Sequence, residues 1–347
     1  MSTSEFVDVT TGAANPYHPE VAANPVPFYD ALRTHAPAAA MHGLPGVHII
    51  SRYEDVKFAL QHPEIFSSGI TTIDIGQERP LIPLQIDPPD HAKYRRVMDP
   101  QLAQKHVVPL EAGVRDLVSE MIDGFASRGA CDAHAELTVP LPCTVFLQMC
   151  DLPLDGLDRF LGWKDDIIRP QARHPEAGFD GTAATRVRHA AAAEIYAFFD
   201  DVIAERRDNP REDLFSRFAQ AEVEGDRMTH EQMLDAGFLF ILAGLDTVTS
   251  TLDCAIAHIG RAPDLRDALV ADPSRIPDAI EELLRLHTPV MQIMRTVIQP
   301  FTLHGVDMSP GDTALVMIGA ADTDPGEFGP TAGGFDFERE SNRHLAF

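Results

Sequence analysis

A carboxylate and a hydroxyl stand side by side at Asp246 and Thr247, directly after an apolar run from Phe238 to Leu245. A helix that is apolar on all faces belongs in a protein core. Gly244 weakens such a helix by about 1 kcal/mol relative to Ala, and Thr247 can bond back to the carbonyl oxygen four residues earlier. A local opening of the helix, with the acid and the alcohol lining a dry pocket, would suit proton delivery through ordered water. The pair is therefore the first candidate for catalysis.

A simpler interpretation is that the helix reaches the surface after Leu245, so that Asp246 and Thr247 are only solvated. Spacing alone favours this interpretation, because structural polar residues outnumber catalytic ones. An unpaired carboxylate in the core would carry a large desolvation cost. Both interpretations stay open on the residues alone.

Other charged residues could be structural or could bind ligands. Glu282 and Arg285 lie three apart on one face of a predicted helix, where an exposed ion pair contributes about 0.2–0.5 kcal/mol. His91 and Arg95 lie four apart on another predicted helix, and Arg295 lies in an extended stretch. Without further information, all of these are ordinary solvated faces.

The stretch Ala243-Gly244-Leu245-Asp246-Thr247 resembles the Ala/Gly-Gly-x-Asp/Glu-Thr signature on the central helix of cytochromes P-450. The Glu-x-x-Arg motif at Glu282–Arg285 follows at about the spacing found in that family. A later stretch, from Asp324-Pro325 to Arg339, resembles the family's meander. The resemblance runs from about residue 20 to the end. It implies the cytochrome P-450 fold: a mainly α, prism-shaped single domain with a small β region over residues 19–347, after a polar N-terminal arm over residues 1–18.

The resemblance also implies a cofactor, haem b, and roles for individual residues. Asp246 and Thr247 would supply protons to iron-bound dioxygen, with Ala243 and Gly244 close to the haem. Four residues match positions that hold the haem propionates: His91, Arg95, Arg295 and His344. Glu282, Arg285 and Arg339 would form a buried structural network, in which bidentate arginine–carboxylate contacts are the strong kind.

The activity implied by the resemblance is insertion of one oxygen atom of O₂ into a C–H bond, with electrons from NAD(P)H through a reductase and a ferredoxin. Lys93 and Arg96 could attract an acidic ferredoxin, or could simply keep a face solvated. In the family, three segments shape the substrate site. Here they offer Ile70, Ile73, Ile75, Val290, Met291 and Ile293. These side chains predict a small apolar substrate such as a terpenoid, steroid or fatty acid.

The family's iron ligand is a cysteine in a Phe-Gly-x-Gly-x-His-x-Cys-x-Gly motif, whose thiolate favours O–O cleavage. None of the four cysteines lies in that context, and the expected ligand would follow Phe347. Three explanations stay open: a fragment of a complete gene, which we favour, a truncated inactive copy, or a different iron ligand. The rival function is accordingly a non-catalytic remnant, either a pseudoenzyme or a ligand-binding helical protein. Peroxide-driven chemistry is a further alternative, against which the acid–alcohol pair argues.

Periodicity predicts long helices at about 107–127, 186–206 and 229–260. Ser51 and Glu54 form a potential capping box, and Asp87-Pro88-Pro89 resembles a second helix start. We expect a strand at Val47–Ile50 and a hairpin turn at Ser309–Asp312.

The chain has 347 residues and a formal net charge of −25, which argues against nucleic-acid binding. No signal-peptide pattern or apolar run of membrane-spanning length is present, which predicts a cytoplasmic protein. Cys131, Cys143, Cys150 and Cys254 form no Cys-x-x-Cys pair, so each is expected to be a small buried residue.

Overall fold

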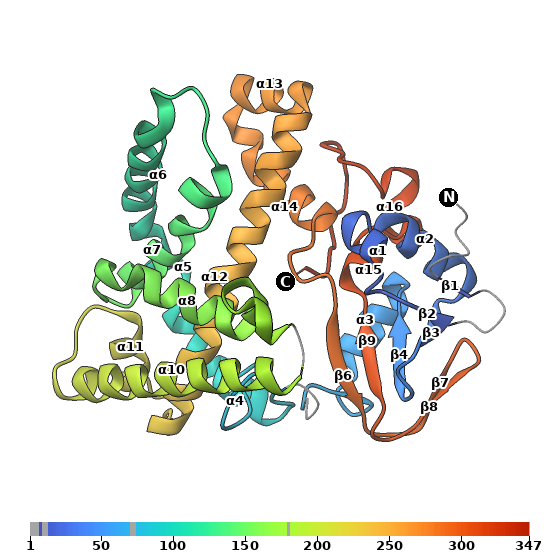
Figure 1. Ribbon diagram of the computed structural model, residues 1–347, viewed down its shortest axis with the longest axis horizontal. Coiled ribbons are helices and arrows are strands. Elements are labelled where there is room, and N and C mark those ends of the chain that lie inside the picture. Colours follow the sequence, from blue (N-terminus) through green and yellow to red (C-terminus); the bar gives the residue numbers. More distant parts are fainter. Residues whose placement is uncertain (1–6, 9–12, 70–73, 179–180, 347) are drawn as a thin grey trace. The chain divides into compact units, whose positions relative to one another are not determined.

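The computed structural model describes residues 7–8, 13–69, 74–178 and 181–346. Ile70 and Ile73, from the predicted substrate set, lie outside these residues. Backbone contacts divide the chain into two compact units. Unit 1 comprises Met1–Ile70 with Cys254–Phe347, and unit 2 comprises Thr71–Asp253 (Figure 1).

Helices make up unit 2. The predicted long helices correspond to α6, α10 and α12, whose ends differ from the expected ones by a few residues, as is usual for boundaries. The helices are α4 (Asp90–Met98), α5 (Gln104–Val107), α6 (Glu111–Ala126), α7 (Pro140–Met149), α8 (Leu157–Ile168), α9 (Pro170–Arg173), α10 (Thr182–Asp208), α11 (Leu214–Gln220) and the larger part of α12 (His230–Arg261).

The core of unit 2 is rich in aromatic side chains. Phe160 of α8, Phe199 of α10, Phe215 of α11 and Phe238 of α12 are all at most 1% exposed. The rings of Phe199 and Phe215 lie 4.9 Å apart, and Phe238 stacks on Tyr196 at 5.3 Å. Large buried rings dominate core energetics, so this cluster fixes α8, α10 and the first part of α12 against one another.

Unit 1 holds the β structure (Figure 1). A seven-stranded sheet has the order β1-β2-β3-β4-β9-β6-β5, and a separate hairpin pairs β7 with β8. β4 pairs with β9 in parallel and β9 pairs with β6 antiparallel. The strands are β1 (Val7–Asp8), β2 (Ala13–Ala14), β3 (Ala38–Met41), β4 (Val47–Ile50), β5 (Phe66–Ser67), β6 (Ile293–Val297), β7 (Phe301–Leu303), β8 (Val306–Met308) and β9 (Thr313–Val316).

The described part of unit 1 also contains seven α-helices and the end of α12. One apolar cluster packs Phe28 and Leu32 of α2 against Ile49 and Leu315 of the sheet. A second packs α3 residues against Val297 and Val316. The helices are α1 (Pro19–Ala23), α2 (Val26–His35), α3 (Tyr53–Gln61), α13 (Pro263–Ala271), α14 (Ile276–Leu286), α15 (Ile318–Asp322) and α16 (Pro325–Phe328).

The two predicted helix starts need correction. α3 begins at Tyr53, and the Ser51 hydroxyl donates to the carbonyl oxygen of Pro37, so no Ser51 capping box forms. The Tyr53 amide is instead bound by the Asp324 carboxylate, 2.9 Å away. α4 begins at Asp90 with Pro89 as its cap, later than the predicted start at Asp87. Caps are therefore supplied here by tertiary contacts as well as by local sequence.

Three smaller expectations also change. The turn at Ser309–Asp312 forms, with Gly311 at φ +97°, but β8 pairs with β7 and β9 pairs with β4 and β6, so it closes no hairpin. The predicted N-terminal arm contains β1 and β2. Cys143 and Cys150 are buried as expected, whereas Cys131 and Cys254 are exposed.

Candidate functional site

The expected local opening of the helix at the acid–alcohol pair is wrong, because α12 runs unbroken from His230 to Arg261. Thr247 donates its hydroxyl to the carbonyl oxygen of Ala243 at 2.7 Å, the local bond that its position predicts. Asp246 is partly buried, its side chain 19% exposed. The simpler interpretation of a freely solvated carboxylate is therefore wrong for Asp246.

Asp246 has two cationic partners in unit 2. Arg169 Nη2 lies 2.5 Å from Asp246 Oδ1, and Lys164 Nζ lies 3.8 Å from the same oxygen. Lys164 also pairs with Asp165 at 3.0 Å, and its side chain is only 4% exposed. Ion pairing offsets the desolvation cost of the buried ammonium group. Lys164 of α8 and Arg169, which follows α8 directly, thus hold the Asp246 carboxylate in a defined position. Thr247 is the next residue in the sequence.

Sequence reasoning did not identify Lys164 and Arg169. A signal for Lys164 exists in α8, where Phe160, Trp163 and Ile167 form a buried stripe at helical spacing. Lys164 occupies a position of this stripe, and a lysine there requires a partner. No comparable local pattern points to Arg169, whose contact with Asp246 depends on the packing of α8 against α12.

Two more threonines follow Thr247 at intervals of two residues. Thr249 donates its hydroxyl to the Leu245 carbonyl oxygen at 2.8 Å, and Thr251 donates to the Thr247 carbonyl oxygen at 2.9 Å. Such side-chain bonds compete with the helix's own hydrogen bonds and bend helices. In this stretch of α12, three backbone carbonyl oxygens therefore accept hydrogen bonds from threonine hydroxyls.

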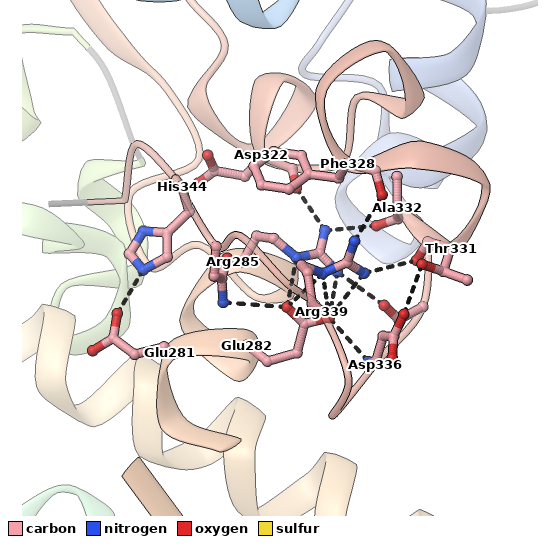
Figure 2. Close-up of polar contacts among 12 residues, drawn as sticks. Glu281, Glu282, Arg285, Asp322, Phe328, Thr331, Ala332, Asp336, Arg339 and His344 are labelled. Atoms are coloured by element: carbon pink, nitrogen blue, oxygen red, sulfur yellow. Dashed lines mark hydrogen bonds and ion pairs between the residues drawn. The ribbon is translucent and has the colours of Figure 1, made fainter. Parts of the chain in front are cut away.

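Glu282 and Arg285 of α14 are buried in unit 1, at 2% and 0% exposure. Two parallel bonds of 2.8 Å join the guanidinium of Arg285 to the Glu282 carboxylate. Arg339 Nε also contacts both Glu282 oxygens, at 3.1 and 3.0 Å (Figure 2). Three residues from α14 and the chain after α16 therefore form one buried network, and the alternative of a weak surface pair is wrong.

The network organises a segment with little regular structure. Arg285 Nη1 donates to the carbonyl oxygens of Asp322 and Ala332, at 2.7 and 2.6 Å, and Arg339 Nη1 donates to that of Phe328 at 2.7 Å. Burial raises the pKa of Glu282, but hydrogen bonds from both arginines outweigh it and leave this pKa below its ordinary value. Glu282 is therefore held as a carboxylate that anchors residues 322–342.

Asp322 is a fully buried carboxyl group beside this network (Figure 2). It accepts hydrogen bonds from the Leu345 amide at 2.7 Å and the Thr288 hydroxyl at 2.9 Å. Burial raises its pKa from 3.8 to about 6, against the smaller opposing effect of these two bonds. Asp322 therefore loses its proton in the folded protein at a higher pH than in the unfolded chain.

Replacing Asp322 with Asn is expected to stabilise the protein above pH 6. Because the folded pKa is the raised one, the contribution of Asp322 is fully present below pH 3.8 and is lost as pH rises to about 6. This loss amounts to at most about 3 kcal/mol. The Asn side-chain oxygen can still accept from the Leu345 amide. Its NH₂ group can donate to the Thr288 hydroxyl, which can then donate to the Arg285 carbonyl oxygen 3.1 Å away. Urea unfolding from pH 4 to pH 8 measures the effect.

The matched control is Asp267→Asn, because the Asp267 side chain is 70% exposed. The control should leave the pH dependence of the unfolding free energy unchanged. Equal pH dependence in the wild-type protein and in Asp322→Asn would show that Asp322 does not titrate in this range.

The four residues predicted to hold propionates are distributed over both units. His91 and Arg95 lie on α4 of unit 2, and Arg95 pairs with Asp99 at 2.8 Å. Arg295 lies on β6, and His344 contacts Glu281 at 3.0 Å, both in unit 1. Their joint action on one macrocycle stays a prediction.

Lys93 and Arg96, the predicted docking residues, both pair with Asp226, at 3.2 and 3.8 Å, so part of their charge is neutralised.

The predicted substrate residues that the structure describes also divide between the units. Ile75 packs against the unit 2 core, and Ile293 against a core cluster of unit 1. Val290 and Met291 are exposed, at 37% and 49%. The role of these four residues in binding a substrate stays a prediction.

Two small residues, Ala243 and Gly244, leave one face of α12 open within its own unit. Ala243 is exposed, and a methyl group added at Gly244 would meet only Phe146 Cδ2, at 4.0 Å. The helix's own unit therefore leaves open space above these two small residues, as close approach of a large planar group requires.

The two buried cysteines, Cys143 and Cys150, are unsuited to be a thiolate ligand of iron. Burial raises the pKa of Cys143 to about 12 and that of Cys150 further still, so neither is a thiolate at neutral pH. Cys131 and Cys254 are exposed. In the described parts of the chain, no group of three or more His, Cys, Asp or Glu side chains is arranged to hold a metal ion.

Only α12, among the described residues, is long and apolar enough to cross a membrane. A core helix passes the same test of length and composition. Asp235 and Asp246 of α12 form ion pairs with Arg79 and Arg169 inside unit 2, which supports a role for α12 as a core helix.

Comparisons with known proteins agree on one family. The family model described as Cytochrome P450 matches residues 173–344. The chain is 32% identical to the probable cytochrome P450 127A1 of Sinorhizobium fredii over 305 residues, which is 87% of this chain and 70% of that protein. It is also 32% identical to the steroid C26-monooxygenase of Mycolicibacterium smegmatis over 304 residues, 87% of this chain and 74% of that protein.

Solved structures show the same fold. Cytochrome P450 CYP109Q5 from Chondromyces apiculatus matches with a TM-score of 0.84 and 28% identity, covering 96% of this chain and 83% of that one. CYP109E1 from Bacillus megaterium in complex with testosterone matches with a TM-score of 0.79 and 26% identity, covering 93% and 83%. The mainly α architecture with small sheets is thus the fold of these proteins.

Proposed function

Because the chain belongs to the cytochrome P450 family, we propose that it inserts one oxygen atom of O₂ into a C–H bond of a small hydrophobic substrate. Membership of this family establishes that the protein is a monooxygenase, an oxidoreductase with haem b as its cofactor. The haem, when bound, supplies the activation of dioxygen. The paired carboxylate of Asp246 beside Thr247 is the observation that carries the proposal for this chain.

In this proposal, Asp246 and Thr247 deliver protons to the reacting oxygen. Arg169 and Lys164 hold the Asp246 carboxylate in place, and any proton that this group passes on is first taken up from water. The Thr247 hydroxyl, 2.7 Å from the Ala243 carbonyl oxygen, can exchange this partner for a water molecule or a ligand oxygen. Ala243 and Gly244 leave space for the cofactor, and His91, Arg95, Arg295 and His344 would bind its propionates.

An apolar substrate of steroid size is the first class to test. One relative is named a steroid C26-monooxygenase, and the CYP109E1 structures hold testosterone and corticosterone. Apolar contacts on this chain are offered by Ile75, Val290, Met291 and Ile293.

We propose a ferredoxin as the electron donor, with Lys93 and Arg96 in its docking surface, although Asp226 offsets part of their charge. Free cysteines support a cytoplasmic location.

The test is carbon monoxide binding to the reduced, haem-loaded protein. The proposal requires a thiolate ligand, and none of the four cysteines of residues 1–347 lies in the family's ligand motif, so two proteins should be compared. One is the 347-residue chain, and the other adds whatever coding sequence follows the Phe347 codon in the gene. The thiolate-type Soret band in the second protein, with a substrate-induced spin-state shift, is the expected result.

The rival function makes the opposite prediction. A non-catalytic remnant would show no thiolate-type band in either protein, and the absence of this band from both would overturn the proposed activity. A Cys143→Ala variant is the matched control, since a buried neutral thiol should contribute nothing to the spectrum.

A further inference from the structure

Residues 74–79 form neither helix nor strand, and the chain bends at 75–76 and again at 78–79. They belong to the stretch before α4 that carries Ile75, one of the proposed substrate residues. Their own side chains close local turns: Asp74 Oδ1 accepts from the Gly76 amide at 3.0 Å, and Gln77 Oε1 accepts from the Ile75 amide at 2.9 Å. The segment therefore has a defined shape even though it lacks regular structure.

Alternate residues of this segment meet one face of α10. Asp74 contacts His189 at 2.8 Å, Gly76 lies against Ala192, and the Glu78 amide donates to the Tyr196 hydroxyl at 3.3 Å. His189, Ala192 and Tyr196 are three and four residues apart, so they form one helical ridge. These three contacts, spread from Asp74 to Glu78, hold the segment along α10.

Gly76 shows how close this docking is. Its φ is +89°, and a Cβ atom at this position would lie 2.7 Å from Ala192 Cβ and 2.8 Å from the Arg188 carbonyl oxygen. The second neighbour is backbone and cannot move aside independently. Only glycine satisfies both the backbone conformation and the separation.

Arg79 connects the same segment to α12. Its Nε atom donates to Asp235 Oδ2 at 3.0 Å, and its guanidinium lies 5.6 Å from the centre of the Tyr196 ring. The Tyr196 hydroxyl donates to the other Asp235 oxygen at 3.2 Å. Asp235 is 2% exposed, so displacing Arg79 would leave a buried carboxylate without this cation.

We propose that Arg79 is a positioning residue for the substrate site, which clamps residues 74–79 to α10 and α12 so that the three move as one body. Asp235 lies about 16 Å before Asp246 along α12, from the helical rise per residue. The clamp therefore fixes the position of Ile75 along α12 relative to the proposed catalytic pair, Asp246 and Thr247. This inference rests on the proposed function for its effect on substrate, but the clamp itself is independent of it.

The test combines hydrogen exchange with kinetics on the Arg79→Gln protein. The Ile75, Gly76 and Glu78 amides are expected to exchange at least about 10-fold faster than in the wild-type protein, while amides at 199–206 of α10 keep their rates. With the haem-loaded enzyme, KM for an apolar substrate should rise about 10-fold and kcat stay within about 2-fold. Arg79→Lys should restore part of the protection, because it retains a cation for Asp235.

Gly76→Ala is an independent variant that leaves every charge in place, and it should give the same local loss of protection. Gly129→Ala is its matched control, since Gly129 has φ +68° but nothing within 4 Å of an added Cβ. Unchanged exchange at residues 75–78 in Arg79→Gln and Gly76→Ala would overturn the clamp, as would an equal increase throughout unit 2. If the carbon monoxide test fails while local exchange still rises, the clamp stands and the proposed function falls.

Discussion

Replacing Asp246 with Asn is expected to lower the rate of product formation by about 10²–10⁴-fold, the usual contribution of a positioned proton donor. Asn has the shape of Asp and can still accept a hydrogen bond from Arg169, so the fold should be retained. NAD(P)H oxidation should fall less than product formation, because electrons are then released as hydrogen peroxide. The measurement is the ratio of product and peroxide to NAD(P)H consumed, in the haem-loaded enzyme with its electron donor.

Thr247→Ala and Thr247→Ser separate the role of the hydroxyl from that of the helix. The Ala variant should uncouple electron consumption from product formation, and the Ser variant should recover most of the coupling, because Ser can make the same bond to the Ala243 carbonyl oxygen. Thr251→Ala provides the control, since Thr251 makes a similar backbone bond one turn further along α12. Normal coupling in both Asp246→Asn and Thr247→Ala would refute the proton-delivery role.

Replacing Glu282 with Gln is expected to reduce the free energy of unfolding by about 3–5 kcal/mol, the cost of breaking a buried ion pair. The loss arises because two guanidinium groups, those of Arg285 and Arg339, keep their positive charges in a site that no longer has a carboxylate. Natural domains are stable by only about 5–15 kcal/mol. The variant should therefore unfold at a much lower urea concentration, as measured by circular dichroism.

The matched control for this prediction is Glu338→Gln. Glu338 also pairs with an arginine, Arg275, at 2.8 Å, but its side chain is 85% exposed. Exposed pairs contribute about 0–1 kcal/mol, so the control should unfold close to the wild-type midpoint. Similar midpoints for the two variants would mean that burial adds nothing to the Glu282 network.

Much of the secondary structure could be predicted from the sequence, because the periodicity of α6, α10 and α12 and the strand at Val47–Ile50 are local patterns. The predicted turn at Ser309–Asp312 also forms, with Gly311 at positive φ as its type requires. The strands on either side could not be paired correctly, since the partners of β9 are β4 and β6, which are distant along the chain.

The same distinction applies to single side chains. Ser51 has the right type and spacing for a helix cap, yet Asp324 binds the Tyr53 amide, because the packing of unit 1 places that carboxylate there. Asp246 and Thr247 could be found from their position in an apolar run. The buried stripe of α8 indicates that Lys164 needs a partner, but tertiary packing decides that Lys164 and Arg169 both meet Asp246. Sequence patterns indicate which residues need partners, and tertiary structure decides which partners they obtain.

The parallel pairing of β4 with β9 has a consequence for biosynthesis. β4 leaves the ribosome early, whereas its neighbour β9 follows only after all of Thr71–Asp253 has been translated. At about 5–20 residues per second, this delay lasts on the order of 10–50 s. During that interval the nascent β3–β4 ribbon presents an unpaired edge, which other chains could join. Translation speed through the intervening codons, and chaperones that shield this edge, should therefore influence the yield of folded protein.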